Sequence, residues 1–143
     1  LSDEYLLRVL PLEQQRIELL SELIPAISFF LSGDIDHTSV LGHMVPKGRD
    51  AQTTAQALLD LVDHLDEQTR KGFTHAQLEP ACRSFAEKIG WKTKELFMCI
   101  RLGMTGRTAA PPLFDTMEVL GKDLTRRRLR LAAQALLAMP TPV

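Results

Sequence analysis

Apolar residues recur along this chain at spacings of three and four, and no stretch alternates with period two for the length of a strand. The clearest example is a helix predicted over residues 51–70. Its apolar stripe comprises Ala55, Leu58, Leu59, Val62 and Leu65. A stripe of this kind buries one side of a helix against other helices. The sequence therefore predicts an all-α fold, a bundle of about six to eight helices.

Local signals mark where several of these helices begin and end. A capping-box pattern at residues 74–77 opens a helix that Gly90 ends. Two prolines at residues 111–112 suit the first turn of a helix that Gly121 ends. The other helices expected after residue 38 span residues 40–45, 93–104 and 122–138. The polar segment 32–38 is the expected boundary between two helical parts.

The charge is divided unevenly along the chain. The net charge of the 143 residues is −1, but residues 1–90 contain 14 acids and 8 bases, whereas residues 91–143 contain 4 acids and 9 bases. The two parts therefore have net charges of −6 and +5. The second part can face a phosphate backbone, or it can form an ordinary solvated basic helix. Charge alone leaves both alternatives open.

Patterns typical of catalysis, metal binding or membrane insertion do not occur in the sequence. The four histidines are scattered, and neither Cys82 nor Cys99 belongs to a C-x-x-C motif, so no metal site or disulfide is expected. The first residues are acidic, and no apolar run approaches the roughly 18 residues of a membrane span. No nucleophile can be matched with a base by spacing. The sequence predicts a cytoplasmic protein with reduced thiols and no catalytic residues.

The most specific string occupies residues 100–114 and is I-R-L-G-M-T-G-R-T-A-A-P-P-L-F. It resembles the L-R-x-A-L-T-G-R-x-x-S-P-G-L-F string near the C-terminus of bacterial glutamyl-tRNA synthetases. Residues 119–123 resemble the L-L-G-K-E of the same family, which an Arg-rich helix follows. Upstream, residues 5–8, 16–20 and 29–30 resemble its R-x-x-x-L and Y/F-F-F segment. The order and spacing of these matches hold over essentially the whole chain.

The resemblance implies a parent polypeptide that ligates glutamate to tRNA with ATP and Mg in a separate catalytic domain. The HIGH and KMSKS signatures of that domain do not occur in these 143 residues. The implied partners of this chain are the anticodon stem-loop of tRNA(Glu) and the catalytic domain of the same polypeptide, without a cofactor of its own and without membrane or DNA. Residues 1–31 would complete one helical anticodon-binding subdomain, and residues 32–143 would form the terminal one.

The family's motifs assign roles to four residues. Arg101 matches an arginine that meets the first anticodon base, and Arg16 matches a position where discriminating enzymes recognise the third base with arginine. Pro111 and Leu113 match the turn that packs against splayed anticodon bases. Arginine presents a fixed fork of donors, which suits the adjacent O2 and N3 acceptors of cytosine and not the N1 and N2 donors of guanine. The string departs from the family's pattern at two positions, Gly103 for Ala and Pro112 for Gly.

Structural alternatives stay open for each of these assignments. Arg16 can be an ordinary surface charge beside nearby glutamates. Candidate phosphate contacts are Arg107, Arg126, Arg127 and Arg130, and the last three, with Arg128, can equally form a solvated face. Trp91 and Phe73 can stack on bases or pack in the core. The whole chain can also be a helical protein–protein interaction module, or the same domain from a paralogous or non-discriminating synthetase.

Overall fold

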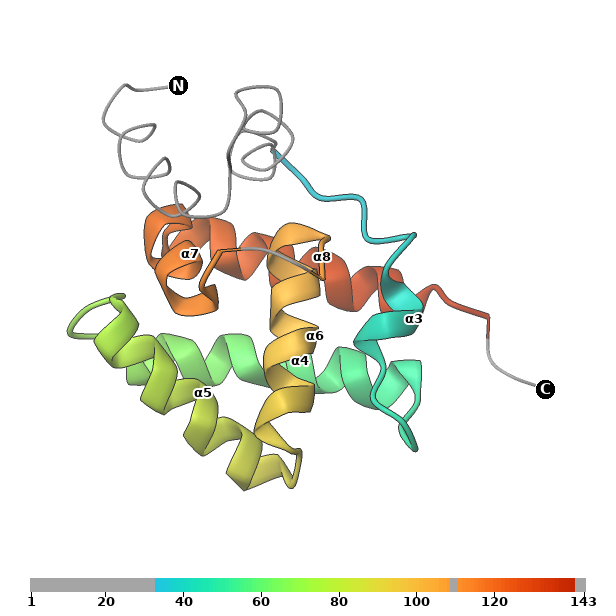
Figure 1. Ribbon diagram of the computed structural model, residues 1–143, viewed down its shortest axis with the longest axis horizontal. Helices are drawn as coiled ribbons and strands as arrows, with labels where there is room; N and C mark the ends of the chain where they lie inside the picture. The colour runs from blue at the N-terminus through green and yellow to red at the C-terminus, as the bar shows by residue number, and fades with distance from the viewer. Residues whose placement is uncertain (1–32, 109–110, 141–143) are drawn as a thin grey trace.

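The structure is a computed structural model that describes residues 33–108 and 111–140 of the chain. The described residues form six helices and no strand, which confirms the predicted all-α fold for this part of the chain (Figure 1). The helices are α3 (Leu41–Met44), α4 (Ala51–Gln68), α5 (His75–Ile89), α6 (Thr93–Thr105), α7 (Leu113–Leu120) and α8 (Lys122–Leu137). The expected subdomain at residues 1–31, including Arg16, lies outside the described residues.

The helix ends follow the local signals in the sequence. Thr74 and Gln77 form a reciprocal capping box at the start of α5. Asp50 caps α4 by accepting a hydrogen bond from the Thr53 amide at 2.7 Å. Gly90 and Gly106 end α5 and α6 in the left-handed conformation, with φ values of 75° and 69°. The capping box and the helix end at Gly90 were predicted from the sequence, because these interactions are made within a few residues.

The core lies between α4 and α8, which make the most extensive helix–helix contact. In Figure 1 the two helices run side by side, and α6 crosses them. Buried leucines and alanines from both helices fill the space between them, among them Leu58, Leu61, Leu129, Ala132 and Leu136. Helices α5 and α7 pack against each other beside this central pair. The arrangement places the C-terminal end of α6 against α8 and close to segment 33–37.

Gly103 allows α6 and α8 to cross closely. A Cβ atom at this position would lie 3.3 Å from Cδ2 of Leu129 and 3.6 Å from Cβ of Ala132. The first distance is slightly shorter than an ordinary van der Waals contact, so an added methyl group would require Leu129 to shift. Gly103, which stands where the family's string has Ala, therefore lies at the contact between α6 and α8.

No helix among the described residues is long and apolar enough to cross a membrane.

Candidate nucleic-acid interface

Arg101 and Pro111 form a contact between α6 and the turn that precedes α7. Nη1 of Arg101 donates a hydrogen bond of 3.1 Å to the carbonyl oxygen of Pro111. The side chain of Arg101 is half-buried on the last full turn of α6, and Pro111 and Leu113 are buried. The structure therefore brings together three of the residues that the sequence string predicted. The contact fixes the position of the guanidinium beside the start of α7.

Aromatic and apolar side chains continue the same side of α6 toward its N-terminus. Phe97 and Met98 precede Arg101 by four and three residues and are half-buried. The ring of Phe97 meets the ring of Phe114 edge-on, with centroids 5.0 Å apart. Phe114 follows Leu113 in the first turn of α7. A partly exposed apolar surface thus adjoins Arg101, and flat surfaces of this kind can support unpaired bases.

The C-terminal end of α6 is held by side chains from distant parts of the chain. The Leu102 carbonyl accepts from the Gly106 amide at 2.8 Å, the Gly103 carbonyl from His37 Nε2 at 2.7 Å, and the Met104 carbonyl from Arg128 Nη1 at 2.7 Å. Thr105 Oγ1 also donates to the Arg101 carbonyl at 2.8 Å. Helix ends leave such carbonyls without partners inside the helix. These partners hold the last turn of α6, which directly follows Arg101.

Arg128 is neither an exposed phosphate contact nor part of a solvated face, the two alternatives that the sequence left open for the Arg-rich helix. Its side chain has no exposed surface, and its positive charge lies at the negative end of α6. The helical periodicity of the sequence indicates this burial, because residue 128 lies four before Ala132 and three after Thr125 on the buried stripe of α8. We conclude that Arg128 is a structural residue, which the pattern of charges alone did not reveal.

The other arginines of α8 lie on its outer side. Nε of Arg126 donates to Asp66 at 2.7 Å, and Arg127 binds both carboxylate oxygens of Asp34, at 2.6 and 2.8 Å. The hydrogen bond from Arg127 lowers the pKa of the Asp34 carboxyl group. Arg130 is exposed and makes no ion pair within the described part of the chain. Exposed pairs of this kind contribute little stability and exchange partners readily.

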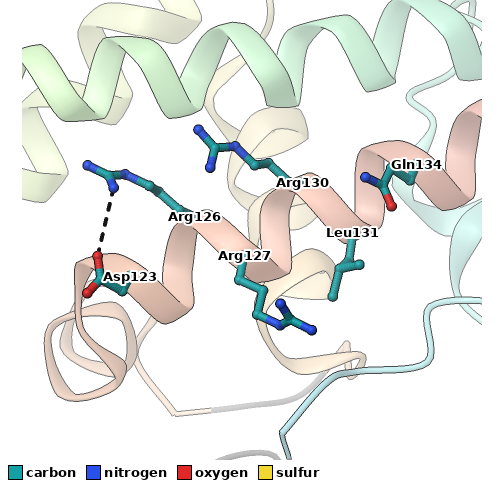
Figure 2. Close-up of a pocket in the computed structure, with 6 residues that line it drawn as sticks. All are labelled: Asp123, Arg126, Arg127, Arg130, Leu131 and Gln134. Carbon is teal, nitrogen blue, oxygen red and sulfur yellow. Dashed lines mark ion pairs between the residues drawn. The ribbon is translucent and has the colours of Figure 1, made fainter.

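A shallow groove of about 370 Å³ follows these arginines along α8. Its lining residues are Asp123, Arg126, Arg127, Arg130, Leu131 and Gln134. Figure 2 shows that Arg126 and Arg130 extend toward one side of α8 and Arg127 toward the other. Asp123 lies 3.8 Å from Arg126 and reduces the net positive charge at that end of the groove. The groove suits an anion, with most of its positive charge near Arg130.

Arg107 is half-buried in the turn that follows α6. Its backbone amide donates to Oγ1 of Thr105 at 3.1 Å, which ties the turn to the last residue of the helix. Trp91 packs in the core with 6% of its surface exposed, and the guanidinium of Arg49 lies 4.9 Å above its ring. Phe73 is partly buried against the same core. Both aromatic residues therefore pack against the core of the protein.

The family model described as "Anticodon binding domain" matches residues 1–133, so this chain belongs to the anticodon-binding domain family. The family predicted from the string at residues 100–114 is thereby confirmed.

The chain is similar to the glutamate–tRNA ligases of particular organisms. The chain is 40% identical over 134 residues to the glutamate–tRNA ligase of Roseiflexus castenholzii, covering 94% of this chain and 26% of that protein. It is 35% identical over 133 residues to the glutamate–tRNA ligase of Chloroflexus aurantiacus, covering 92% and 26%. The chain thus spans about a quarter of the length of these curated relatives.

A solved structure shares the fold. The crystal structure of a glutamate tRNA ligase from Elizabethkingia meningosepticum in complex with its amino acid matches with a TM-score of 0.75 at 22% identity. The match covers 95% of this chain and 26% of that one. At this identity the likeness establishes the fold of the domain and nothing more specific.

Proposed function

We propose that this chain is the anticodon-binding part of a glutamate–tRNA ligase and that it binds the anticodon stem-loop of tRNA(Glu). In this proposal the parent polypeptide attaches glutamate to tRNA in the cytoplasm, and ATP and Mg act in its catalytic domain. The described residues contribute RNA recognition. The relatives from Roseiflexus castenholzii and Chloroflexus aurantiacus are both glutamate–tRNA ligases, which supports this identity of the parent.

The observation that carries the proposal is the hydrogen bond between Arg101 and Pro111. It joins two parts of the family string that are ten residues apart into one surface beside Phe97 and Met98. Specific RNA recognition usually targets unpaired bases, which stack on apolar side chains while their edges meet hydrogen-bonding groups. Arg101 would meet the first anticodon base, and Pro111 and Leu113 would shape the turn against which the bases pack. A protein-interaction module has no requirement for this arrangement.

The other arginines that the sequence predicted to contact RNA are supported by their positions or by their motif. Arg130 and the outer donors of Arg126 and Arg127 border the groove on α8 and would neutralise backbone phosphates. Arg107 lies in the turn directly after α6 and would contribute charge near the loop. Arg16 is assigned to the third anticodon base through its motif, and it lies outside the described residues.

The experiment compares binding of a glutamate-type anticodon stem-loop with binding of a loop altered at the first anticodon base. Arg101→Ala should weaken binding of the first loop by roughly 5- to 150-fold and remove the preference between the two loops. Arg101→Lys, which keeps the charge and loses the planar fork, should also lose the preference. Arg70→Ala is the matched control, because Arg70 is exposed in the turn that follows α4. Equal losses for Arg101→Ala and Arg70→Ala would refute base recognition by Arg101.

A further inference from the structure

Arg83 lies beside the candidate interface although no motif singles it out. It projects from α5, and its guanidinium lies 5.3 Å from the centroid of the Phe97 ring. Its side chain is 56% exposed. The position over an aromatic face restrains the guanidinium through a cation–π contact. Arg83 is thus a partly ordered, solvent-facing charge next to the surface that contains Arg101.

Lys94 extends the same strip of positive charge along α6. It is exposed, and it precedes Phe97 by three residues and Arg101 by seven, which places all three on one side of the helix. The distance along the helix from residue 94 to residue 101 is about 10 Å. The strip formed by Arg83, Lys94 and Arg101 is therefore long enough to accompany an RNA backbone beyond a single nucleotide.

The carboxylate nearest to Arg83 is a weak competitor. Oε1 of Glu79 lies 3.3 Å from Nη2 of Arg83, and both side chains are substantially exposed. Ion pairs between exposed residues one helix turn apart contribute only about 0.3–0.5 kcal/mol. A backbone phosphate also presents a negative charge on two unesterified oxygens, and it can replace Glu79 because the free energy of this exposed pair is small.

The side of α5 that faces α4 borders a surface of negative charge that α4 supplies. A groove between α4 and α5 is lined by the exposed carboxylates Asp60, Asp63 and Glu67, with Lys88 as its base. This face would repel a phosphate backbone. The contrast between the two sides of α5 favours approach of RNA from the α6 side, where Arg83 and Lys94 lie.

We propose that Arg83, held over Phe97, and Lys94 bind backbone phosphates of the RNA strand whose base meets Arg101. This inference rests on the proposed function and adds a site that positions the strand without recognising its sequence. Phosphate contacts of this kind fix register and add affinity, while contacts to base edges provide the selectivity.

The test measures binding of the same two anticodon stem-loops over a range of salt concentrations. Arg83→Ala should weaken binding of both loops by the same factor, roughly threefold to tenfold, and should reduce the salt dependence by about 0.7 in log–log slope. Arg83→Lys should keep the slope of the unaltered chain. Glu79→Gln removes the competing carboxylate and should strengthen binding. Arg70→Ala and Lys88→Ala are controls of matched charge and should leave the slope closer to that of the unaltered chain.

The outcomes separate this inference from the proposed function. If Arg83→Ala binds like Arg70→Ala in affinity and slope while Arg101→Ala loses the base preference, the phosphate site is wrong and the proposed function stands. A loss for Arg83→Ala that depends on the anticodon base would overturn its assignment to the backbone. If the unaltered chain shows no preference between the two loops, the proposed function itself fails. Far-ultraviolet circular dichroism of each variant checks that the helices remain folded.

Discussion

Nη1 of Arg128 lies 2.7 Å from the carbonyl oxygen of Met104, and this hydrogen bond joins the middle of α8 to the last turn of α6. Arg128 is completely buried, so its charge is stabilised by the end of a helix instead of by water. The bond also holds the last turn of α6, which directly follows Arg101. An arginine that belongs to a basic cluster in the sequence thus supports the candidate interface from inside the protein.

Replacing Arg128 should destabilise the fold strongly. Arg128→Met keeps much of the side-chain volume and removes the donor, which leaves the Met104 carbonyl without this partner in the interior. We expect a loss of about 2–4 kcal/mol in the free energy of unfolding. Arg130→Met, on the exposed side of the same helix, should change it by less than about 0.5 kcal/mol. Urea unfolding followed by circular dichroism measures both, and similar values for the two variants would contradict the structural role.

Gly103 should tolerate one methyl group and no more. Gly103→Ala gains up to about 1 kcal/mol of helix propensity but brings Cβ to 3.3 Å from Leu129 Cδ2, the flexible end of a side chain. We expect these effects to offset each other within about 1 kcal/mol. Gly103→Val adds two more methyl groups at the same crossing and should cost about 1–3 kcal/mol. Thermal and urea unfolding would show whether the step from alanine to valine has the larger cost.

His75 should make stability fall as the pH rises. A hydrogen bond of 3.0 Å to Asp115, with help from Glu79, raises the pKa of His75 above its usual 6.5. The folded protein then binds the proton more tightly than the unfolded chain does. The stabilisation is complete below pH 6.5 and is lost as the pH rises through the raised pKa. His75→Asn should abolish this change in unfolding free energy, and His43→Asn, at an exposed position, should retain it.

His37 should make the stability of the fold decrease as the pH falls below 6.5. Burial lowers its pKa below 6.5, and its Nε2 donates to the Gly103 carbonyl. The unfolded chain therefore takes up a proton at a pH where folded His37 stays neutral. The stabilisation is present above pH 6.5 and is lost as the pH falls through the lowered pKa. His37→Gln retains an N–H donor and should make the unfolding free energy less dependent on pH between 6.5 and 5. An unchanged acid-side slope in this variant would show that His37 does not titrate with folding.

Arg16 provides a test of selectivity in the parent enzyme. If it recognises the third anticodon base, the enzyme should prefer C to G at that position. Arg16→Gln should relax the preference, because a neutral amide offers both an acceptor and donors. The expected loss is about 1–3 kcal/mol of discrimination, with little change in stability. Aminoacylation efficiency on two tRNAs that differ only at that base measures it. A parent enzyme that shows no preference would indicate a non-discriminating or paralogous synthetase.

Much of the fold followed from the sequence because its signals are local. The helix predicted over residues 51–70 is α4, which ends at Gln68, and the helix predicted over 122–138 is α8, which ends at Leu137. The capping box at Thr74 and the left-handed glycines Gly90 and Gly106 act within one turn of the chain. Apolar periodicity selects the buried side of each helix in the same way. Local interactions of this kind do not depend on any tertiary contact, so the sequence is enough to predict them.

The sequence by itself also determined the family, since the string at residues 100–114 and its spacing to the following motifs are specific. Only the tertiary structure decided which arginines support the protein and which face outward. Arg127 pairs with Asp34 and Arg128 with the end of α6, although the two are adjacent in the chain. The physical reason is that a helix places neighbouring residues about 100° apart, and the burial of each depends on which distant helix packs there. The partners of Arg101 and Arg128 come from other helices and turns, and the aromatic ring beneath Arg83 belongs to α6, so no local pattern encodes these contacts.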